Sequence, residues 1–183
     1  APHVLEIAND ITLLNYVTEF FGALPSVDYI GAWWSLPNEN LSLTQSYHRD
    51  IDTLHSLKFF VYLTDVNENN GPHIYVEGSS NSNFVSSKDK MHSDGEVLES
   101  FSAETIRNLI GPMGHCFLAD TFGLHKGLLP KNSPRLVLQI IYSIKRTPFG
   151  PKKPFLSSAE VKNINLNTPS SVIVNKNIVN WKT

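Results

Sequence analysis

The chain has 183 residues, of which 41% are hydrophobic and 17% charged, with a formal net charge of -2. This composition is typical of a globular protein with one sizeable core, so we expect a single domain over residues 1 to 183. The slightly acidic balance excludes the basic surface of a nucleic-acid-binding protein, and no stretch is apolar for long enough to span a membrane. The single cysteine, Cys116, excludes an internal disulfide and favours a reducing, cytoplasmic location.

The N-terminal part of the chain has a helical pattern. Residues 4–22 carry apolar side chains at helical spacing, which predicts an N-terminal helical segment. Asn9 or Asp10 is suited to cap its second part, and Gly22 is suited to end it. From Tyr29 onward the pattern changes to short β-like runs separated by turn residues, so we expect few other helices.

The predicted core covers residues 29–145 and consists mainly of strands. Continuous or alternating apolar runs bounded by turn residues predict strands at 29–36, 41–51, 57–66, 72–80, 114–122 and 134–144. Between them we expect a surface loop at 79–95 and a short helix at 103–110, with an irregular tail at 146–183. Many short strands with few helices indicate a mainly β, largely antiparallel sandwich or barrel, and disfavour a doubly wound α/β fold.

A histidine and an aspartate lie two positions apart in the second predicted strand. Side chains alternate between the two faces of a strand, so His48 and Asp50 point one way while Tyr47 and Arg49 point the other. His125, after a later predicted strand, is a candidate third ligand. Two histidines and one carboxylate form the facial triad that binds Fe(II) and leaves positions open for a cosubstrate and O2.

The same spacing occurs a second time, at His92-Ser93-Asp94, so the pattern alone is weak evidence. The second copy lies in a polar segment, where we expect no regular strand to hold its geometry. His48 instead lies between strand-like runs and precedes the most apolar run of the chain. We therefore predict that the first copy is the metal-binding one.

Arg135 opens the last predicted strand, shortly after His125 and a turn-rich segment. Alternation would point it inward, together with Val137 and Gln139. A guanidinium in an apolar interior requires an anionic partner, and its planar fork suits a carboxylate. Arg135 is therefore a candidate site for a dicarboxylate cosubstrate, although an exposed strand end or an ion pair within the protein explains the sequence equally well.

Two blocks of sequence resemble the phytanoyl-CoA dioxygenase family of Fe(II)/2-oxoglutarate oxygenases. The first is YHRDIDTLHSLKFFVYLTDVNENNGPHIYVEGSS, residues 47–80, and the second is GHCFLADTFGLHKGLLPKNSPRLVLQIIYS, residues 114–143. Together the similarity covers roughly residues 29–145. The order of the features is that of the family: a His-x-Asp pair, an apolar strand, Asn-Gly-Pro, a Gly-Ser strand end, a distal histidine and a following arginine.

The resemblance implies a double-stranded β-helix, also called a jelly roll or cupin-like fold, with a few flanking helices. It implies Fe(II) bound by His48, Asp50 and His125, with Arg135 gripping the far carboxylate of the cosubstrate 2-oxoglutarate. It also implies oxidation of a small-molecule substrate by O2, and the carboxylate of Asp50 indicates a hydroxylase rather than a halogenase. The sequence departs from the family at Ser80, where a histidine is usual, and at Gly127, where some members carry a hydroxyl residue.

Other residues have weaker assignments. Gln45 and Phe60 are candidates for the cosubstrate pocket. A solvated side chain is an equally simple interpretation of Gln45, and plain core packing is the preferred interpretation of Phe60. Asp120 either orients His125 as a second-shell partner or is an ordinary turn carboxylate. We expect His73 to be a structural or surface residue, because its spacing supports no metal role.

Two alternatives to an oxygenase stay open. One is a cupin-like protein that binds a divalent metal without 2-oxoglutarate chemistry, and the other is an inactive family member that acts as a binding module. Formation of succinate would distinguish the oxygenase from both. The sequence does not identify the substrate or the oligomeric state.

Overall fold

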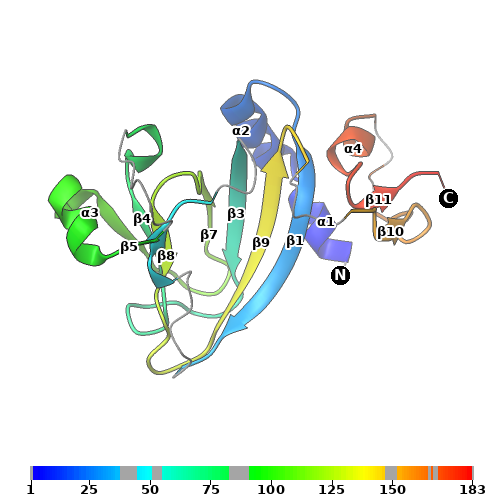
Figure 1. Ribbon diagram of the computed structural model, residues 1–183. Helices are drawn as coiled ribbons and strands as arrows, with labels where there is room; N and C mark the ends of the chain where they lie inside the picture. Colours follow the sequence, from blue (N-terminus) through cyan, green and yellow to red (C-terminus); the bar gives the residue numbers. More distant parts are fainter. Residues whose placement is uncertain are drawn as a thin grey trace. The chain divides into compact units, whose positions relative to one another are not determined.

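The computed structural model describes residues 2–37, 45–50, 55–82, 91–146, 152–164, 166 and 169–182. The chain forms two compact units, and Figure 1 labels their helices and strands. Unit 1 comprises Ala1–Gly31, Asp52–Phe59 and Gln139–Thr183, and unit 2 comprises Ala32–Ile51 and Phe60–Leu138. The single domain expected from the sequence stays a prediction. No helix in the described part of the chain is long and apolar enough to cross a membrane.

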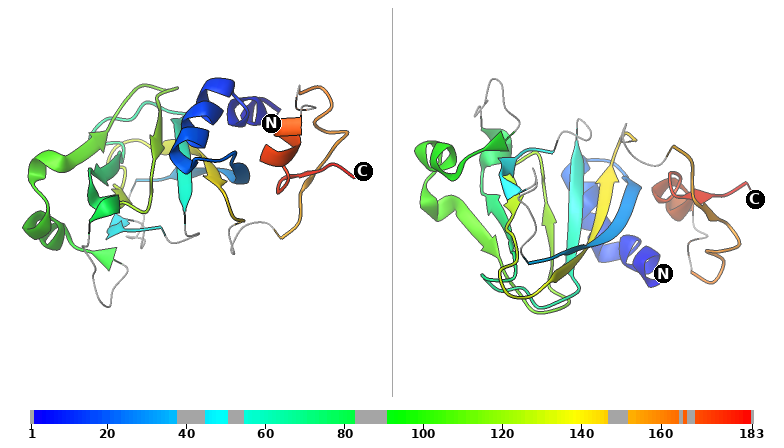
Figure 2. Two further views of the ribbon diagram at one scale, coloured as in Figure 1. Left: turned by 90° about the horizontal axis from the view of Figure 1, so that it is seen from above. Right: turned by 60° about the horizontal axis from the view of Figure 1, so that its bottom comes forward.

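Unit 1 begins with the predicted N-terminal helical segment, which consists of two helices, α1 Pro2–Ala8 and α2 Ile11–Phe21 (Figure 2). The side chain of Asp10 accepts a hydrogen bond from the backbone of Leu13 and caps α2. Gly22 ends α2 with a φ of 65°, a left-handed conformation that glycine adopts without steric cost. Both predicted cap positions are therefore confirmed.

The C-terminal tail is not irregular as expected, because short elements occur in its described part: β10 Leu156–Ser157, α4 Pro169–Val174 and β11 Val179–Asn180. β10 and β11 pair in parallel. The buried carboxylate of Asp28 accepts hydrogen bonds from Asn177 and, at 2.6 Å, from Ser143. Elements this short carry almost no periodic signal, so the tertiary contacts of the tail decide its structure.

Two sheets form the β-structure. The four-stranded sheet has the order β1-β9-β3-β7, and the five-stranded sheet the order β5-β2-β8-β4-β6. The bounds of these strands are β1 Ser26–Ser35, β2 Tyr47–His48, β3 Ser56–Tyr62, β4 His73–Val76, β5 Met91–His92, β6 Ile106–Leu109, β7 Cys116–Ala119, β8 His125–Gly127 and β9 Arg135–Ser143. Within the five-stranded sheet, β2 pairs with β5 and β8, and β4 pairs with β6 and β8, all antiparallel.

Within unit 2 the two sheets pack face to face. Phe60 of β3 and Phe117 of β7 lie with their ring centroids 5.1 and 5.5 Å from the ring of His73 in β4. The Tyr62 hydroxyl accepts a hydrogen bond from the backbone of His73 and donates one to the Leu109 carbonyl of β6. This mainly β sandwich with few helices is the predicted double-stranded β-helix.

The five-stranded sheet has an outer face that packs against α3, Asp94–Ser100 (Figures 1 and 2). The buried cluster on this face contains Tyr47, Ile74, Val76, Val97 and Leu124. Lys126 of β8 points to the same side, where its ammonium lies 2.6 Å from Asp94 and 4.3 Å from the ring centroid of Tyr47. The residues that alternate with these along the strands, among them His48, His73 and His125, point to the inner face.

Two local predictions in unit 2 were wrong, and a third is tested only in part. Residues 103–110 form a 3-10 turn, Ala103–Thr105, followed by β6, because residues 106–109 pair along their whole length with β4 and tertiary pairing overrides helix propensity. The expected loop at 79–95 contains a 3-10 turn, Ser79–Asn81, and the strand β5, and it leads into α3. The strand expected at 41–51 is described only over residues 45–50, and of these Tyr47–His48 form the strand β2; residues 38–44 and 51–54 lie outside the described residues.

Candidate metal centre

Two adjacent strands and the residues after one of them bring His48, Asp50 and His125 together. His48 of β2 is the direct register partner of His125 in β8. Asp50 follows β2, and its backbone N–H donates a 2.8 Å hydrogen bond to the carbonyl of Thr121. One ligand atom from each of the three side chains lies within 4.8 Å of the other two. In the described part of the chain, this is the only such group of three or more histidine, cysteine or acidic residues.

The nitrogen atoms of the two imidazoles are oriented by the backbone. His48 Nδ1 lies 2.9 Å from the carbonyl of Ser46, and His125 Nδ1 lies 2.9 Å from that of Gly123. A carbonyl only accepts, so each Nδ1 carries the proton and each Nε2 presents its lone pair. These Nε2 atoms lie 3.6 and 3.3 Å from the carboxylate oxygens of Asp50.

Such an arrangement fits a divalent metal ion. Three acceptor groups that face one another repel unless a cation or a proton lies among them. Ligands at about 2.1 Å from a metal, at right angles, are about 3 Å apart, close to the distances between the Nε2 atoms and the carboxylate. Both imidazoles are buried and the carboxylate is partly buried, so few waters compete for the position. Two nitrogens and one carboxylate on one side leave open coordination positions on the other.

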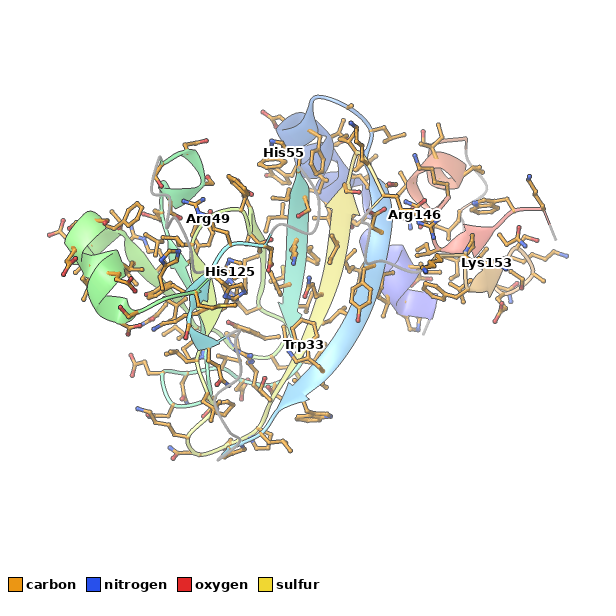
Figure 3. All side chains as sticks on the ribbon, in the orientation of Figure 1. Trp33, Arg49, His55, His125, Arg146 and Lys153 are labelled. Carbon is orange, nitrogen blue, oxygen red and sulfur yellow. The ribbon has the colours of Figure 1, made fainter. Side chains whose placement is uncertain are left out.

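Arg49, between the two ligands in the chain, points away from them, as the alternation of side chains predicts. Its guanidinium donates to the carbonyls of Phe122 and Ser79 and to the hydroxyl of Ser82, and it stacks 5.2 Å from the Phe122 ring centroid. Figure 3 shows Arg49 and His125 in the same region of unit 2. Arg49 thus ties the end of β2 to the turn whose Gly123 carbonyl orients His125.

Asp120 does not orient His125, contrary to one of the two roles expected for it. Its carboxylate accepts a hydrogen bond from the backbone of Phe122, and its carbonyl accepts one from the Tyr75 hydroxyl. It is therefore a turn carboxylate, and a backbone carbonyl orients His125 in its place. Backbone partners of this kind depend on turn geometry and leave no side-chain signal in the sequence.

Arg135 is buried at the start of β9, as are Val137 and Gln139. Its guanidinium donates hydrogen bonds to the carbonyl of Gly71 and, at 3.0 Å, to the hydroxyl of Ser35, while Nε has no partner. Burial lowers the pKa of this guanidinium from its usual value. Among the described residues no carboxylate pairs with it, so a buried positive charge is compensated only by neutral acceptors.

His73, expected to be a structural or surface residue, lies beside the metal group. Its ring is stacked on that of His125, with centroids 5.3 Å apart and planes 19° apart. Its Nε2 is buried and has no hydrogen-bond partner. Burial, and then the neighbouring His125 and Arg135, hold the pKa of His73 well below its usual value. No metal-ligand spacing marks this residue in the sequence; only the register of β4 against β8 reveals it.

The two weaker cosubstrate candidates have different surroundings. Phe60 is buried and packs against His73 and Phe117, with ring centroids 5.1 and 5.2 Å away. It therefore backs the histidine beside the metal group, which suits either interpretation of its role. Gln45 is partly buried just before β2, and its role stays a prediction.

The second His-x-Asp copy does not join the metal group. His92 is buried in β5, contrary to the expectation of a polar loop. Ser93 caps α3 through a reciprocal pair of hydrogen bonds with Glu96. Asp94 forms an ion pair with Lys126.

The chain matches no family model and no curated protein. Among solved structures, apo HygX from Streptomyces hygroscopicus is similar with a TM-score of 0.59 and 18% identity, over 78% of this chain and 68% of that one. ThoJ, a non-haem monooxygenase, gives a TM-score of 0.53 at 19% identity, over 77% of this chain and 54% of that one. SnoN, a non-haem α-ketoglutarate-dependent epimerase from nogalamycin biosynthesis, gives 0.56 at 16% identity, over 78% and 57%.

This chain therefore spans 54% to 68% of the lengths of these three proteins. Other structures of HygX contain iron, or nickel with 2-oxoglutarate. At such identities the likeness establishes the fold. The chain is structurally similar to non-haem iron and 2-oxoglutarate-dependent enzymes, with a mainly β double-stranded β-helix and a candidate His-Asp-His metal group.

Proposed function

We propose that the protein is an Fe(II)- and 2-oxoglutarate-dependent dioxygenase that hydroxylates an unactivated C–H bond of a small molecule. The observation that carries this proposal is the convergence of His48, Asp50 and His125, with both Nε2 lone pairs facing the carboxylate, inside a double-stranded β-helix. Iron bound with 2-oxoglutarate and O2 supplies the oxidising power, with release of succinate and CO2.

The role of the protein in this proposal is to hold the metal and keep its ligands in the correct protonation state. The carbonyls of Ser46 and Gly123 keep both Nδ1 atoms protonated, so that each Nε2 binds the metal as a neutral imidazole. Asp50 supplies the negative charge. Protons compete for the same lone pairs, so metal binding weakens in acid.

Arg135 is proposed to bind the far carboxylate of 2-oxoglutarate. It is a buried cation without a carboxylate partner among the described residues, and its Nε still has a hydrogen to donate. Gly127 has no side chain to fill the space beside it, since a Cβ there would lie 3.4 Å from the arginine Nη2. Some members of the resembled family carry a hydroxyl residue at this position. The glycine found here instead leaves room for the guanidinium of Arg135.

A carboxylate at position 50 favours hydroxylation, because Asp50 as a ligand would occupy the coordination position that a halide would need. Membership of the phytanoyl-CoA dioxygenase family stays a proposal based on the sequence blocks at residues 47–80 and 114–143. A small-molecule substrate is supported by analogy, since one structure of HygX contains hygromycin B together with nickel and 2-oxoglutarate. Binding of Gln45 to the cosubstrate belongs to the same proposal.

The direct test is succinate formation from 2-oxoglutarate with Fe(II) and O2, measured for the wild type and for His48→Ala and Asp50→Ala. We expect turnover in the wild type and none in either variant. The matched control is His115→Ala. It also removes an imidazole, which lies near the Tyr62 ring and has no role in the proposed site. Turnover that survives in the two ligand variants overturns the proposed metal group. A wild type that binds metal but forms no succinate indicates a cupin-like metal protein instead.

A further inference from the structure

His73 shares the inner face of the five-stranded sheet with the metal ligand His125. In the register of β4 against β8, His73 is opposite Gly127 and Tyr75 is opposite His125. Directly opposed residues point to the same side of a sheet, and so do residues two apart in one strand. His73 is therefore diagonal to the metal ligand, which agrees with the stacking of the two rings.

Arg135 lies over the position opposite His73. Gly127 leaves this position open, and a Cβ there would be 3.4 Å from the arginine Nη2. The imidazole of His73 thus has the metal group on one side and the guanidinium on another.

Two buried nitrogen atoms in this region lack partners: His73 Nε2 and Arg135 Nε. Buried polar atoms are paired in most proteins, because an unpaired one costs free energy. The aromatic rings of Phe60 and Phe117 pack against His73 and offer it no acceptor. A neutral imidazole with its proton on Nε2 and a guanidinium are both donors, so the missing partner of both is an acceptor, and beside a buried cation an anionic one.

We propose that His73 is a cosubstrate-positioning residue, whose Nε2–H donates a hydrogen bond to the far carboxylate of 2-oxoglutarate that Arg135 binds. This inference rests on the proposed function. It assigns the recognition of the dicarboxylate to two buried donors on different strands, β4 and β9. A 2-oxo acid without the far carboxylate gains nothing from either donor.

The test measures binding by calorimetry, with Ni(II) in place of Fe(II) so that no turnover occurs. The two probes are 2-oxoglutarate and 2-oxobutyrate, which lacks the far carboxylate. His73→Phe keeps an aromatic ring but removes both nitrogens, His73→Leu is a second donor-free variant, and His73→Gln retains an amide N–H near the Nε2 position. His115→Phe is the matched control, because it also removes an imidazole near the Phe117 ring.

We expect both donor-free variants to lose about 10- to 100-fold in affinity for 2-oxoglutarate and nothing for 2-oxobutyrate. The glutamine variant should recover part of the loss, and the control should match the wild type. Equal losses for the two acids, or no loss for 2-oxoglutarate, overturn the role of His73 while the proposed function stands. A wild type that binds Ni(II) but no 2-oxoglutarate overturns the proposed function and this inference with it.

Discussion

The segments His48-Arg49-Asp50 and His92-Ser93-Asp94 have identical spacing of histidine and aspartate, and their histidines end neighbouring strands. β2 and β5 pair with His48 opposite Met91, and with Tyr47 opposite His92. The register is offset by one residue, so the two histidines point to opposite faces of the sheet. His48 faces His125 on the inner side, whereas His92 shares the outer side with Tyr47.

The aspartates differ for the same reason. Asp50 lies on the inner side and meets two Nε2 lone pairs. Asp94 meets the ammonium of Lys126, the residue that follows His125 and points to the opposite face. The carboxylate of Asp50 therefore lies among other acceptors, which a metal cation would bridge, whereas the carboxylate of Asp94 is already paired with the ammonium of Lys126. The strand register, which sets the face of the sheet that each copy occupies, therefore decides which groups each copy contacts.

The largest expected effect comes from exchanging the carboxylates for amides in both copies. Asp50→Asn should lower the affinity for Ni(II) at least about a hundredfold, since it removes the charged ligand. Loss of a residue that only hydrogen-bonds to a metal ligand already costs about 10- to 100-fold. Asp94→Asn should leave the affinity for Ni(II) unchanged. It should lower the free energy of unfolding by only about 1 kcal/mol, because the carboxylate of the ion pair that it removes is largely exposed. Calorimetry and urea denaturation measure the two quantities. Equal loss of metal binding in both variants would contradict the comparison.

The middle residues of the two copies provide a second contrast. Arg49→Gln should lower Ni(II) affinity about tenfold, because it loosens the turn whose Gly123 carbonyl orients His125. Ser93→Ala removes only the cap of α3 and should cost about 1 kcal/mol of stability without affecting the metal. If calorimetry gives the same Ni(II) affinity for Arg49→Gln and the wild type, Arg49 is not needed to keep the Gly123 carbonyl in position, and this prediction is wrong.

Lys126 allows a test of the outer face alone. Lys126→Met keeps an unbranched side chain but removes the ion pair with Asp94 and the contact with the Tyr47 ring. We expect the free energy of unfolding to fall by about 1 kcal/mol and the Ni(II) affinity to stay the same. Urea denaturation with calorimetry on the same sample measures both. A loss of metal affinity would show that the two faces of β8 are coupled.

The smallest effect concerns the pH dependence of the cap on α3. The hydrogen bonds from Ser93 hold the pKa of the exposed Glu96 carboxyl below its usual value. A carboxyl whose pKa is lower in the folded state contributes stability above its unfolded pKa, and this contribution disappears as the pH falls through the folded pKa. Glu96→Gln should therefore be less stable than the wild type at neutral pH and equal to it in acid, by urea denaturation across this range. A difference that grows in acid would contradict this sign.

Much of the fold could be predicted from local patterns. The apolar runs predicted the strands that contain Phe60 and Arg135, and the caps of α2 at Asp10 and Gly22 were read from residue type alone. Alternation favoured an inward-pointing Arg135 but left an exposed strand end open, and the structure shows that the side chain is buried. These features depend on a residue and its near neighbours in the chain, and for that reason a single sequence contains them.

Other features depended on contacts between distant segments. Whether residues 106–109 form a helix or a strand was decided by their pairing with β4. The place of His73 beside His125 was decided by the register of β4 against β8, and the inner or outer side of each His-x-Asp copy by the register of β2 against β5. The sequence by itself determined which residues could bind a metal and which face of its strand each would occupy. Only the tertiary structure decided which faces meet, because register follows from the packing of the whole sandwich and no local pattern encodes it.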